Sequence, residues 1–156
     1  MAIVGIDKLS LLDYEDKVSV VLFAQACNMR CPFCHNGAAV LGASKQDEID
    51  FDEILAFLKT RTGLVDAVVF SGGEPTMLED LKVKIKAVRD LGFLIKLDTN
   101  GTNPELLEEL LLCNGPYCKS IVKSPPLGIK PLLFPAPVLR SLHHIVSSNL
   151  FVYGKV

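Results

Sequence analysis

The feature that most constrains the fold is an alternation of short apolar runs with longer segments of helical periodicity. Three runs have the length and composition of buried β-strands: residues 18–24, 66–73 and 93–101. Each is followed along the chain by a segment whose apolar residues recur at helical spacing: residues 50–62, 77–91 and 103–112. Repeated β-α units build parallel sheets with right-handed crossovers. The sequence therefore predicts an α/β fold with a parallel sheet.

Two of the helical segments have an apolar face that predicts which side chains are buried. The first face comprises Phe51, Ile54, Leu55 and Leu58. The second comprises Leu78, Leu81, Ile85 and Val88. Asp50 precedes the first segment as a candidate N-cap, and Pro104 stands at the first turn of the third. Both residue types favour helix starts at these positions.

Three unusual sequences follow the three predicted strands. The first strand leads into CNMRCPFCHNG (27–37), the second ends in SGGEP (71–75), and the third ends in DTNG (98–101). In parallel β/α folds the carboxyl ends of the strands meet at one edge of the sheet, where binding and chemistry take place. We therefore expect the three sequences to form one site.

Cys27, Cys31 and Cys34 are the strongest candidates for metal ligands. In a reducing compartment, cysteines at such short spacing favour metal binding or catalysis over disulfides. Structural zinc sites use four ligands, commonly as two close pairs, whereas this triplet stands alone and Cys113 and Cys118 lie far along the chain. An iron–sulfur cubane held by three thiolates would keep one iron open to an exogenous ligand.

The composition argues against several other classes of protein. At 156 residues the chain has the length of one domain, and no run of about 18 apolar residues predicts a membrane span. The amino terminus carries acidic residues where a signal peptide would be basic, so the cytoplasm is the expected location. A net charge of −2 gives no reason to expect nucleic acid as a partner. The hydrophobic content of 49% is high and is consistent with a face covered by a partner or with a hydrophobic tail.

The three quoted sequences together resemble the motifs of the radical S-adenosylmethionine superfamily. CNMRCPFC, with an aromatic residue before its last cysteine, is similar to the cluster signature, and SGGEP is similar to the methionine-binding motif. The longer forms CPFCHN, SGGEPTM and LDTNG resemble activating enzymes of glycyl radical enzymes, most closely the anaerobic ribonucleoside-triphosphate reductase activating proteins. The likeness covers about residues 16–112, continues weakly to Pro126, and implies a partial (β/α) barrel.

The resemblance implies how the cofactors are bound. Cys27, Cys31 and Cys34 would bind three irons of a [4Fe-4S] cluster. S-adenosylmethionine would chelate the fourth iron through its amino and carboxylate groups. This arrangement would explain why three thiolates occur without a fourth.

The resemblance also implies which residues contact S-adenosylmethionine. Backbone polar groups of Gly72 and Gly73, with the Glu74 carboxylate, would hold its ammonium group, and glycine would allow close approach to the main chain. The residues that match the family segment near the bound cofactor are Asp98, Thr99 and Asn100. Gly72-Gly73 and Asn100-Gly101 are also ordinary turn sequences. The triplet and Glu74-Pro75 favour binding at the first pair, whereas both interpretations stay open for Asp98 to Asn100.

The activity implied by the family is the formation of a radical on another protein. An electron from the reduced cluster would cleave S-adenosylmethionine, and the resulting 5′-deoxyadenosyl radical would abstract hydrogen from a glycine of a partner enzyme. The implied partners are a glycyl radical enzyme and an electron donor of the flavodoxin or ferredoxin type. The cofactors supply the difficult chemistry, and the protein places them and excludes water. Two alternatives remain: a radical enzyme acting on a small molecule such as a nucleobase, and a non-catalytic iron–sulfur module.

The carboxyl-terminal part departs from the family pattern. Related activators have Asp-x-Lys at the end of the next strand, and here Lys123 matches the lysine while Ile121 replaces the aspartate. All 18 acidic residues precede Leu110, whereas six of the nine prolines lie beyond Cys113. We therefore expect a β/α domain over residues 1–126 and an irregular apolar tail over 127–156, either a docking segment or sequence from a shifted reading frame.

Overall fold

The computed structural model describes residues 1–32, 34, 36–37, 48–114, 118–123 and 150–153. The strands of its single sheet are β1 (Ile3–Ser10), β2 (Ser19–Ala24), β3 (Ala67–Gly72), β4 (Leu94–Thr99), β5 (Cys118–Lys123) and β6 (Leu150–Tyr153). The helices are α2 (Phe51–Lys59), the 3-10 helix η2 (Pro75–Met77), α3 (Leu81–Asp90) and α4 (Pro104–Asn114). The three strands and three helices predicted from the alternation are all present.

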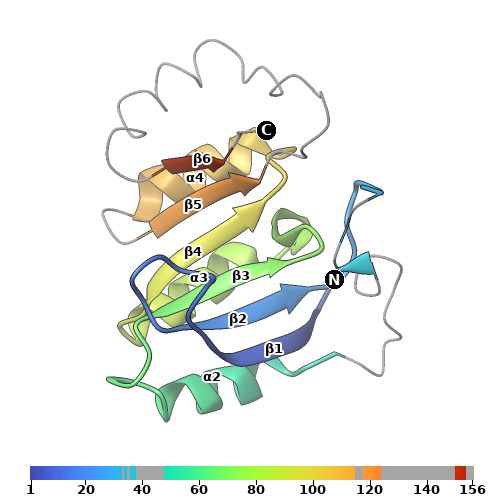
Figure 1. Ribbon diagram of the computed structural model, residues 1–156. Coiled ribbons are helices and arrows are strands. Elements are labelled where there is room, and N and C mark those ends of the chain that lie inside the picture. The colour runs from blue at the N-terminus through green and yellow to red at the C-terminus, as the bar shows by residue number, and fades with distance from the viewer. Residues whose placement is uncertain (33, 35, 38–47, 115–117, 124–149, 154–156) are drawn as a thin grey trace.

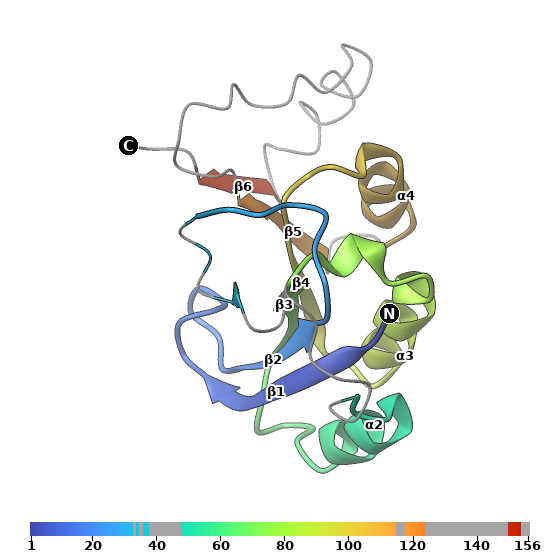
Figure 2. The same ribbon diagram turned by 90° about the vertical axis from the view of Figure 1, so that its right-hand side faces the viewer.

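The order of the strands in the sheet equals their order in the chain, β1-β2-β3-β4-β5-β6 (Figure 1). Every pairing from β2 to β6 is parallel. In Figure 2 helices α2, α3 and α4 all lie on one side of the sheet. A parallel sheet that always advances in one direction and keeps its helices on one face has the winding of a β/α barrel. This confirms the predicted α/β fold, a partial barrel.

The first strand, β1, differs from the expectation of a purely parallel sheet. It pairs antiparallel with β2, and its register shifts between Ile3 and Gly5 and between Asp7 and Ser10. Its sequence mixes charged residues into an apolar pattern because β1 is an edge strand, with Asp7, Lys8 and Leu9 exposed. An edge strand of this kind lacks the continuous apolar run by which the central strands were predicted.

The main core lies between the sheet and the helices. The predicted inward residues of α3, together with Leu78 just before it, are all at most 3% exposed. On α2, Ile54 and Leu58 are buried, and Phe51 and Leu55 pack against the same cluster. Both predicted helix faces are therefore confirmed.

The starts of two helices show how local sequence sets element bounds. Asp50 caps α2, because its Oδ1 accepts a hydrogen bond from the backbone N–H of Asp52 at 3.0 Å. The predicted helix 77–91 begins later than expected, at Leu81. Leu78 has an extended backbone with ψ 118°, which separates η2 from α3.

The other face of the sheet carries a second, smaller apolar cluster. Tyr14, from the segment between β1 and β2, packs there with Val21, Ala67 and Val69. Toward the carboxyl ends of β3 and β4 this face becomes polar, with Ser71, Lys96 and Asp98 all at most 9% exposed. Buried polar side chains at this end of a β/α sheet are a first indication of a site.

The carboxyl-terminal strands extend the sheet beyond the third predicted helix. Ile121, which replaces the expected aspartate, is paired in register with Asp98, and Lys123 occupies the last position of β5. Strand β6 lies within the segment expected to be irregular, and it pairs parallel with β5. The other residues of 127–156 lie outside the described part, so the boundary at 126 stays a prediction. Within the described residues, no helix is long and apolar enough to cross a membrane.

Candidate functional site at the carboxyl ends of the strands

The three motif segments meet at one edge of the sheet, as predicted. Strands β2, β3 and β4 are parallel neighbours (Figure 1). Ala24 at the end of β2 is paired with Gly72 at the end of β3. The cysteine segment leaves β2, the Gly-Gly-Glu turn leaves β3, and the Asp-Thr-Asn-Gly turn leaves β4. We call this edge the rim.

Residues 25–37, which we call the cysteine segment, are held against the Gly-Gly-Glu turn by hydrogen bonds. Gly73 N donates to Ala24 O at 2.9 Å, and Glu74 N donates to Ala26 O at 2.8 Å. At the far end of the segment, Asn36 Nδ2 donates to Gly72 O at 3.1 Å. Both ends of the cysteine segment are therefore held against the end of β3.

The two glycines are required by this close contact. Gly72 has φ +104°, a conformation that side chains disfavour. A Cβ at Gly73 would lie 1.8 Å from Ala26 O, which is far inside van der Waals contact. A side chain at Gly73 is thus excluded by the backbone of Ala26, which belongs to the chain's own cysteine segment.

Glu74 is a buried carboxylate that joins the ends of β3 and β4. It is 1% exposed. Oε1 accepts hydrogen bonds from Thr76 N at 3.0 Å, Thr76 Oγ1 at 2.5 Å and Thr99 Oγ1 at 2.7 Å. Oε2 accepts one from Asn100 N at 2.7 Å. The carboxylate is therefore already satisfied by protein donors, and its predicted contact with an ammonium group stays a prediction.

Asn100 connects the end of β4 to the first cysteine. Its Nδ2 lies 3.8 Å from Cys27 Sγ and 2.8 Å from Asn28 Oδ1. Cys27 Sγ also accepts a hydrogen bond from Met29 N at 3.3 Å. Two N–H donors thus face the sulfur of Cys27, an environment that suits a thiolate ligand of a metal cluster.

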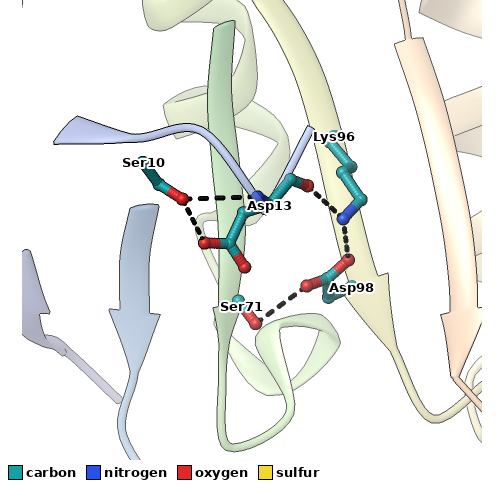
Figure 3. A network of polar contacts seen from close by, with 5 residues as sticks. All are labelled: Ser10, Asp13, Ser71, Lys96 and Asp98. Atoms are coloured by element: carbon teal, nitrogen blue, oxygen red, sulfur yellow. Dashed lines mark hydrogen bonds and ion pairs between the residues drawn. The ribbon is translucent and has the colours of Figure 1, made fainter. Parts of the chain in front are cut away.

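A second polar group lies on the sheet face opposite the helices (Figure 3). Lys96 Nζ forms an ion pair with Asp98 Oδ1 at 3.0 Å, where the side chains are 8% and 3% exposed, and it also contacts Asp13 O. Ser71 Oγ donates to Asp98 Oδ2 at 3.0 Å, and Ser10 Oγ donates to Asp13 Oδ2 at 2.6 Å. Asp98 is thereby held within the sheet, next to the rim.

The structure brings together most of the predicted site residues. Thr99 and Asn100 donate hydrogen bonds to Glu74, which directly follows Gly72 and Gly73 at the end of β3. Asp98 instead belongs to the neighbouring Lys96 group. The backbone of Lys123 lies at the end of β5, two strands away from β3. Lys96 was not predicted as a site residue, although a lysine two positions before Asp98 in an apolar strand shares its face. That spacing was the signal for a buried ion pair.

Cys27, Cys31 and Cys34 are free thiols, as residues that are to bind a cluster must be. Cys27 and Cys31 are half-buried, and Cys34 is exposed. Among the described side chains, no three of His, Cys, Asp or Glu are close enough to hold a single metal ion. Each thiolate of a cubane binds a different iron, so such a cluster needs a wider spacing of sulfurs than one ion does. The donor set and the N–H groups facing Cys27 fit an iron–sulfur cluster.

The fold and the rim together define a class of protein. It has a β/α sheet whose strands follow the order of the chain, and a three-cysteine segment after its first parallel strand. The sequence model of the radical SAM superfamily matches residues 21–120. The chain therefore belongs to the radical SAM superfamily. Membership in this superfamily implies the use of an iron–sulfur cluster and of S-adenosylmethionine.

Individual relatives differ in what their names say. The chain is 43% identical over 110 residues to a Methanocaldococcus jannaschii protein provisionally named a glycyl-radical enzyme activating enzyme, covering 69% of this chain and 43% of that protein. It is 36% identical over 91 residues to an S-adenosylmethionine-dependent nucleotide dehydratase of Selenomonas ruminantium, covering 53% and 30%. The chain thus spans less than half the length of these two curated relatives.

A solved structure shares the fold. The crystal structure of QueE from Escherichia coli aligns with a TM-score of 0.55 over 96% of this chain and 81% of that chain. The sequence identity is 13%, so this likeness supports the fold alone. It agrees with the winding of the sheet.

We expect Glu74→Gln to destabilise the cluster-free protein. The amide nitrogen would place a donor opposite N–H or O–H groups that need an acceptor, at a cost of about 1–3 kcal/mol in the free energy of unfolding. Denaturant unfolding measures this. Glu79→Gln makes the same change at an exposed position, where we expect little effect, and equal stability of the two variants would contradict a structural role for Glu74.

We expect Lys96→Met to cost about 3–5 kcal/mol, because it leaves Asp98 buried without its cation. Adding Asp98→Leu should recover part of the loss, since the uncompensated charge is then removed. The matched control is Lys86→Met, which breaks an ion pair with Asp90 whose side chains are 77% and 61% exposed and should cost at most about 1 kcal/mol. Similar losses at Lys96 and Lys86 would show that the buried pair contributes little.

Proposed function

We propose that this protein is an iron–sulfur oxidoreductase that cleaves S-adenosylmethionine reductively and generates a glycyl radical on a partner enzyme. The observation that carries the proposal is the rim, where the cysteine segment, the Gly-Gly-Glu turn and the end of β4 are joined by hydrogen bonds. When bound, the cluster would supply the electron that yields the 5′-deoxyadenosyl radical. Anaerobic ribonucleotide reductase is the partner that the longer motif forms favour.

The residues of this chain would divide the binding between them. Cys27, Cys31 and Cys34 would hold the cluster and leave one iron for S-adenosylmethionine. Backbone groups of Gly72 and Gly73 would receive its ammonium, since they lie beside the cysteine segment. Glu74 would add its charge to that pocket while keeping the pocket walls together.

The remaining predicted residues have supporting places in this proposal. Thr99 and Asn100 fix the end of β4 against the Gly-Gly-Glu turn by donating hydrogen bonds to Glu74. Asp98, paired with Lys96, provides a fixed polar surface on the sheet face next to the rim. Lys123 matches the lysine of the family's Asp-x-Lys pattern and ends β5, and we propose it as a cofactor-binding residue.

The choice of a protein substrate rests on the motif forms and on the 43% identical relative whose name gives an activating enzyme. An electron donor of the flavodoxin or ferredoxin type and a cytoplasmic location belong to the same proposal. The second candidate is a radical enzyme acting on a small molecule, which is favoured by the relative named as a nucleotide dehydratase. The two differ in whether the radical is transferred to a glycine of another protein.

The direct experiment is anaerobic reconstitution with iron and sulfide, followed by addition of S-adenosylmethionine and a reductant. We expect about four irons per chain and formation of 5′-deoxyadenosine. Incubation with an anaerobic ribonucleotide reductase should then give the electron paramagnetic resonance signal of a glycyl radical. Formation of 5′-deoxyadenosine with no radical on any glycyl radical enzyme would favour the small-molecule alternative.

Cysteine variants test which thiols bind the cluster. Cys27→Ala, Cys31→Ala and Cys34→Ala should each abolish iron binding, measured by iron content and by the cluster's visible absorbance. Cys113→Ala and Cys118→Ala are the matched controls and should load normally. Iron loading that survives loss of Cys31 but requires Cys113 would refute the assignment.

We also propose that residues 127–156 contribute little to cluster binding. A chain ending at Pro126 should take up as much iron as the full chain, because the rim is built from strands β2, β3 and β4. It would lose β6, whose pairing with β5 spans four residue pairs. If the shortened chain unfolds or binds no iron, the tail is an integral part of the domain.

A further inference from the structure

We infer that Asn100 is a positioning residue that directs an N–H donor at the sulfur of Cys27 and thereby raises the reduction potential of the cluster. The inference rests on the proposed function, because it concerns the cluster that the cysteines would hold. It assigns a role to a side chain that the sequence placed only near the cofactor.

The orientation of the Asn100 amide is determined by its neighbours. Oδ1 accepts from Thr102 N at 3.0 Å, and a backbone N–H can only donate. The oxygen must therefore face Thr102, and the nitrogen must face the cysteine segment. There Nδ2 has two hydrogens and two acceptors, Asn28 Oδ1 at 2.8 Å and Cys27 Sγ at 3.8 Å.

A closed ring of hydrogen bonds reinforces this orientation. Asn100 Nδ2 donates to Asn28 Oδ1, and Asn28 Nδ2 donates to Thr102 Oγ1 at 2.7 Å. Thr102 Oγ1 donates to Asn100 Oδ1 at 2.7 Å, which completes the ring. Hydrogen bonds in a ring polarise one another, so each favours the others. Asn100 is further held by its backbone N–H, which donates to Glu74 Oε2 at 2.7 Å.

Cluster binding would strengthen the contact with Cys27. As a free thiol, Cys27 can itself donate to Asn28 Oδ1, which lies 3.9 Å away. A sulfur bound to iron has lost its proton and can only accept, so the N–H donors from Asn100 and Met29 remain as its partners. N–H groups facing cluster sulfurs stabilise the reduced, more negative state and raise the potential.

The three cysteines are not equivalent in this respect. Within the described part of the chain, the sulfurs of Cys31 and Cys34 have no hydrogen-bond donor comparable to Asn100, whereas Cys27 has one from each side of the rim. Counting only donors from the described residues, the thiolate of Cys27 would therefore be the most stabilised of the three. The geometry gives the cluster an electronic asymmetry that the cysteine spacing alone does not predict.

The test is a redox titration of the reconstituted cluster without S-adenosylmethionine. Asn100→Asp keeps the oxygen that Thr102 needs but removes the N–H donor, and Asn100→Ala removes the donor without adding charge. Both variants should shift the midpoint potential to lower values, by up to a tenfold change in the reduction equilibrium, about 59 mV for a one-electron couple. The shift should be larger for Asn100→Asp. Asn103→Asp is the matched control, because Asn103 Oδ1 instead accepts from Leu106 N at 3.3 Å at the start of α4.

Each outcome decides between a positioning and a purely structural role. Potentials of both Asn100 variants equal to that of Asn103→Asp, with normal iron content, would overturn the inference and leave the proposed function intact. If neither variant holds a cluster, the melting temperature of the cluster-free protein decides. An unchanged value supports positioning of Cys27, and a lowered value makes Asn100 structural. Failure of the unaltered protein to bind a cluster would instead refute the proposed function.

Discussion

The buried carboxylate of Glu74 is the interaction on which the rest of the rim depends. A carboxylate removed from water is costly unless donors replace its hydration, and here four donors do so from η2 and from the end of β4. Its backbone N–H in turn donates to Ala26 O in the cysteine segment. One residue therefore contacts all three segments that leave the parallel strands. Because the carboxylate is satisfied only when η2 and the end of β4 are both in place, these segments fold together, which gives a potential binding site a defined shape before any ligand is present.

The winding of the sheet explains why the polar groups gather where they do. The helices cover one face of the sheet (Figure 2). The alternating side chains of β3 and β4 therefore separate into an apolar core and a second face that carries Ser71, Lys96 and Asp98. The same alternation directs Thr99 toward Glu74 and Asp98 toward Lys96. Neighbouring residues of one short motif thus serve two different groups, which is a direct consequence of strand geometry.

The sequence was informative wherever a local pattern determines a local structure. Central strands, helix faces and the N-cap at Asp50 were predicted because burial on both sides of a strand, on one side of a helix, or at a helix end each selects residue types within a few positions. Strand β1 was missed because an edge strand lacks that selection. At the site, the motifs located Glu74 and Asn100, but not their partners. The contact between Asn100 and Asn28 spans 72 positions, and no periodicity predicts which amide meets which.

At the rim, the buried carboxylate of Glu74 is connected to the sulfur of Cys27 through a single residue, Asn100. From the Glu74 carboxylate, one hydrogen bond reaches the backbone of Asn100, and the Asn100 side chain reaches Cys27 Sγ. A change at Glu74 can therefore alter the surroundings of Cys27, the proposed cluster ligand, which Glu74 does not touch. The same carboxylate also borders the glycines proposed to receive the ammonium of S-adenosylmethionine. A ligand that drew Glu74 Oε2 toward itself would compete with Asn100 N–H for that oxygen, so its binding would be coupled to the donor facing Cys27. If the proposed cluster and ammonium pocket are both present, the connectivity of the rim would thus give a physical route by which ligand binding changes the potential of the cluster.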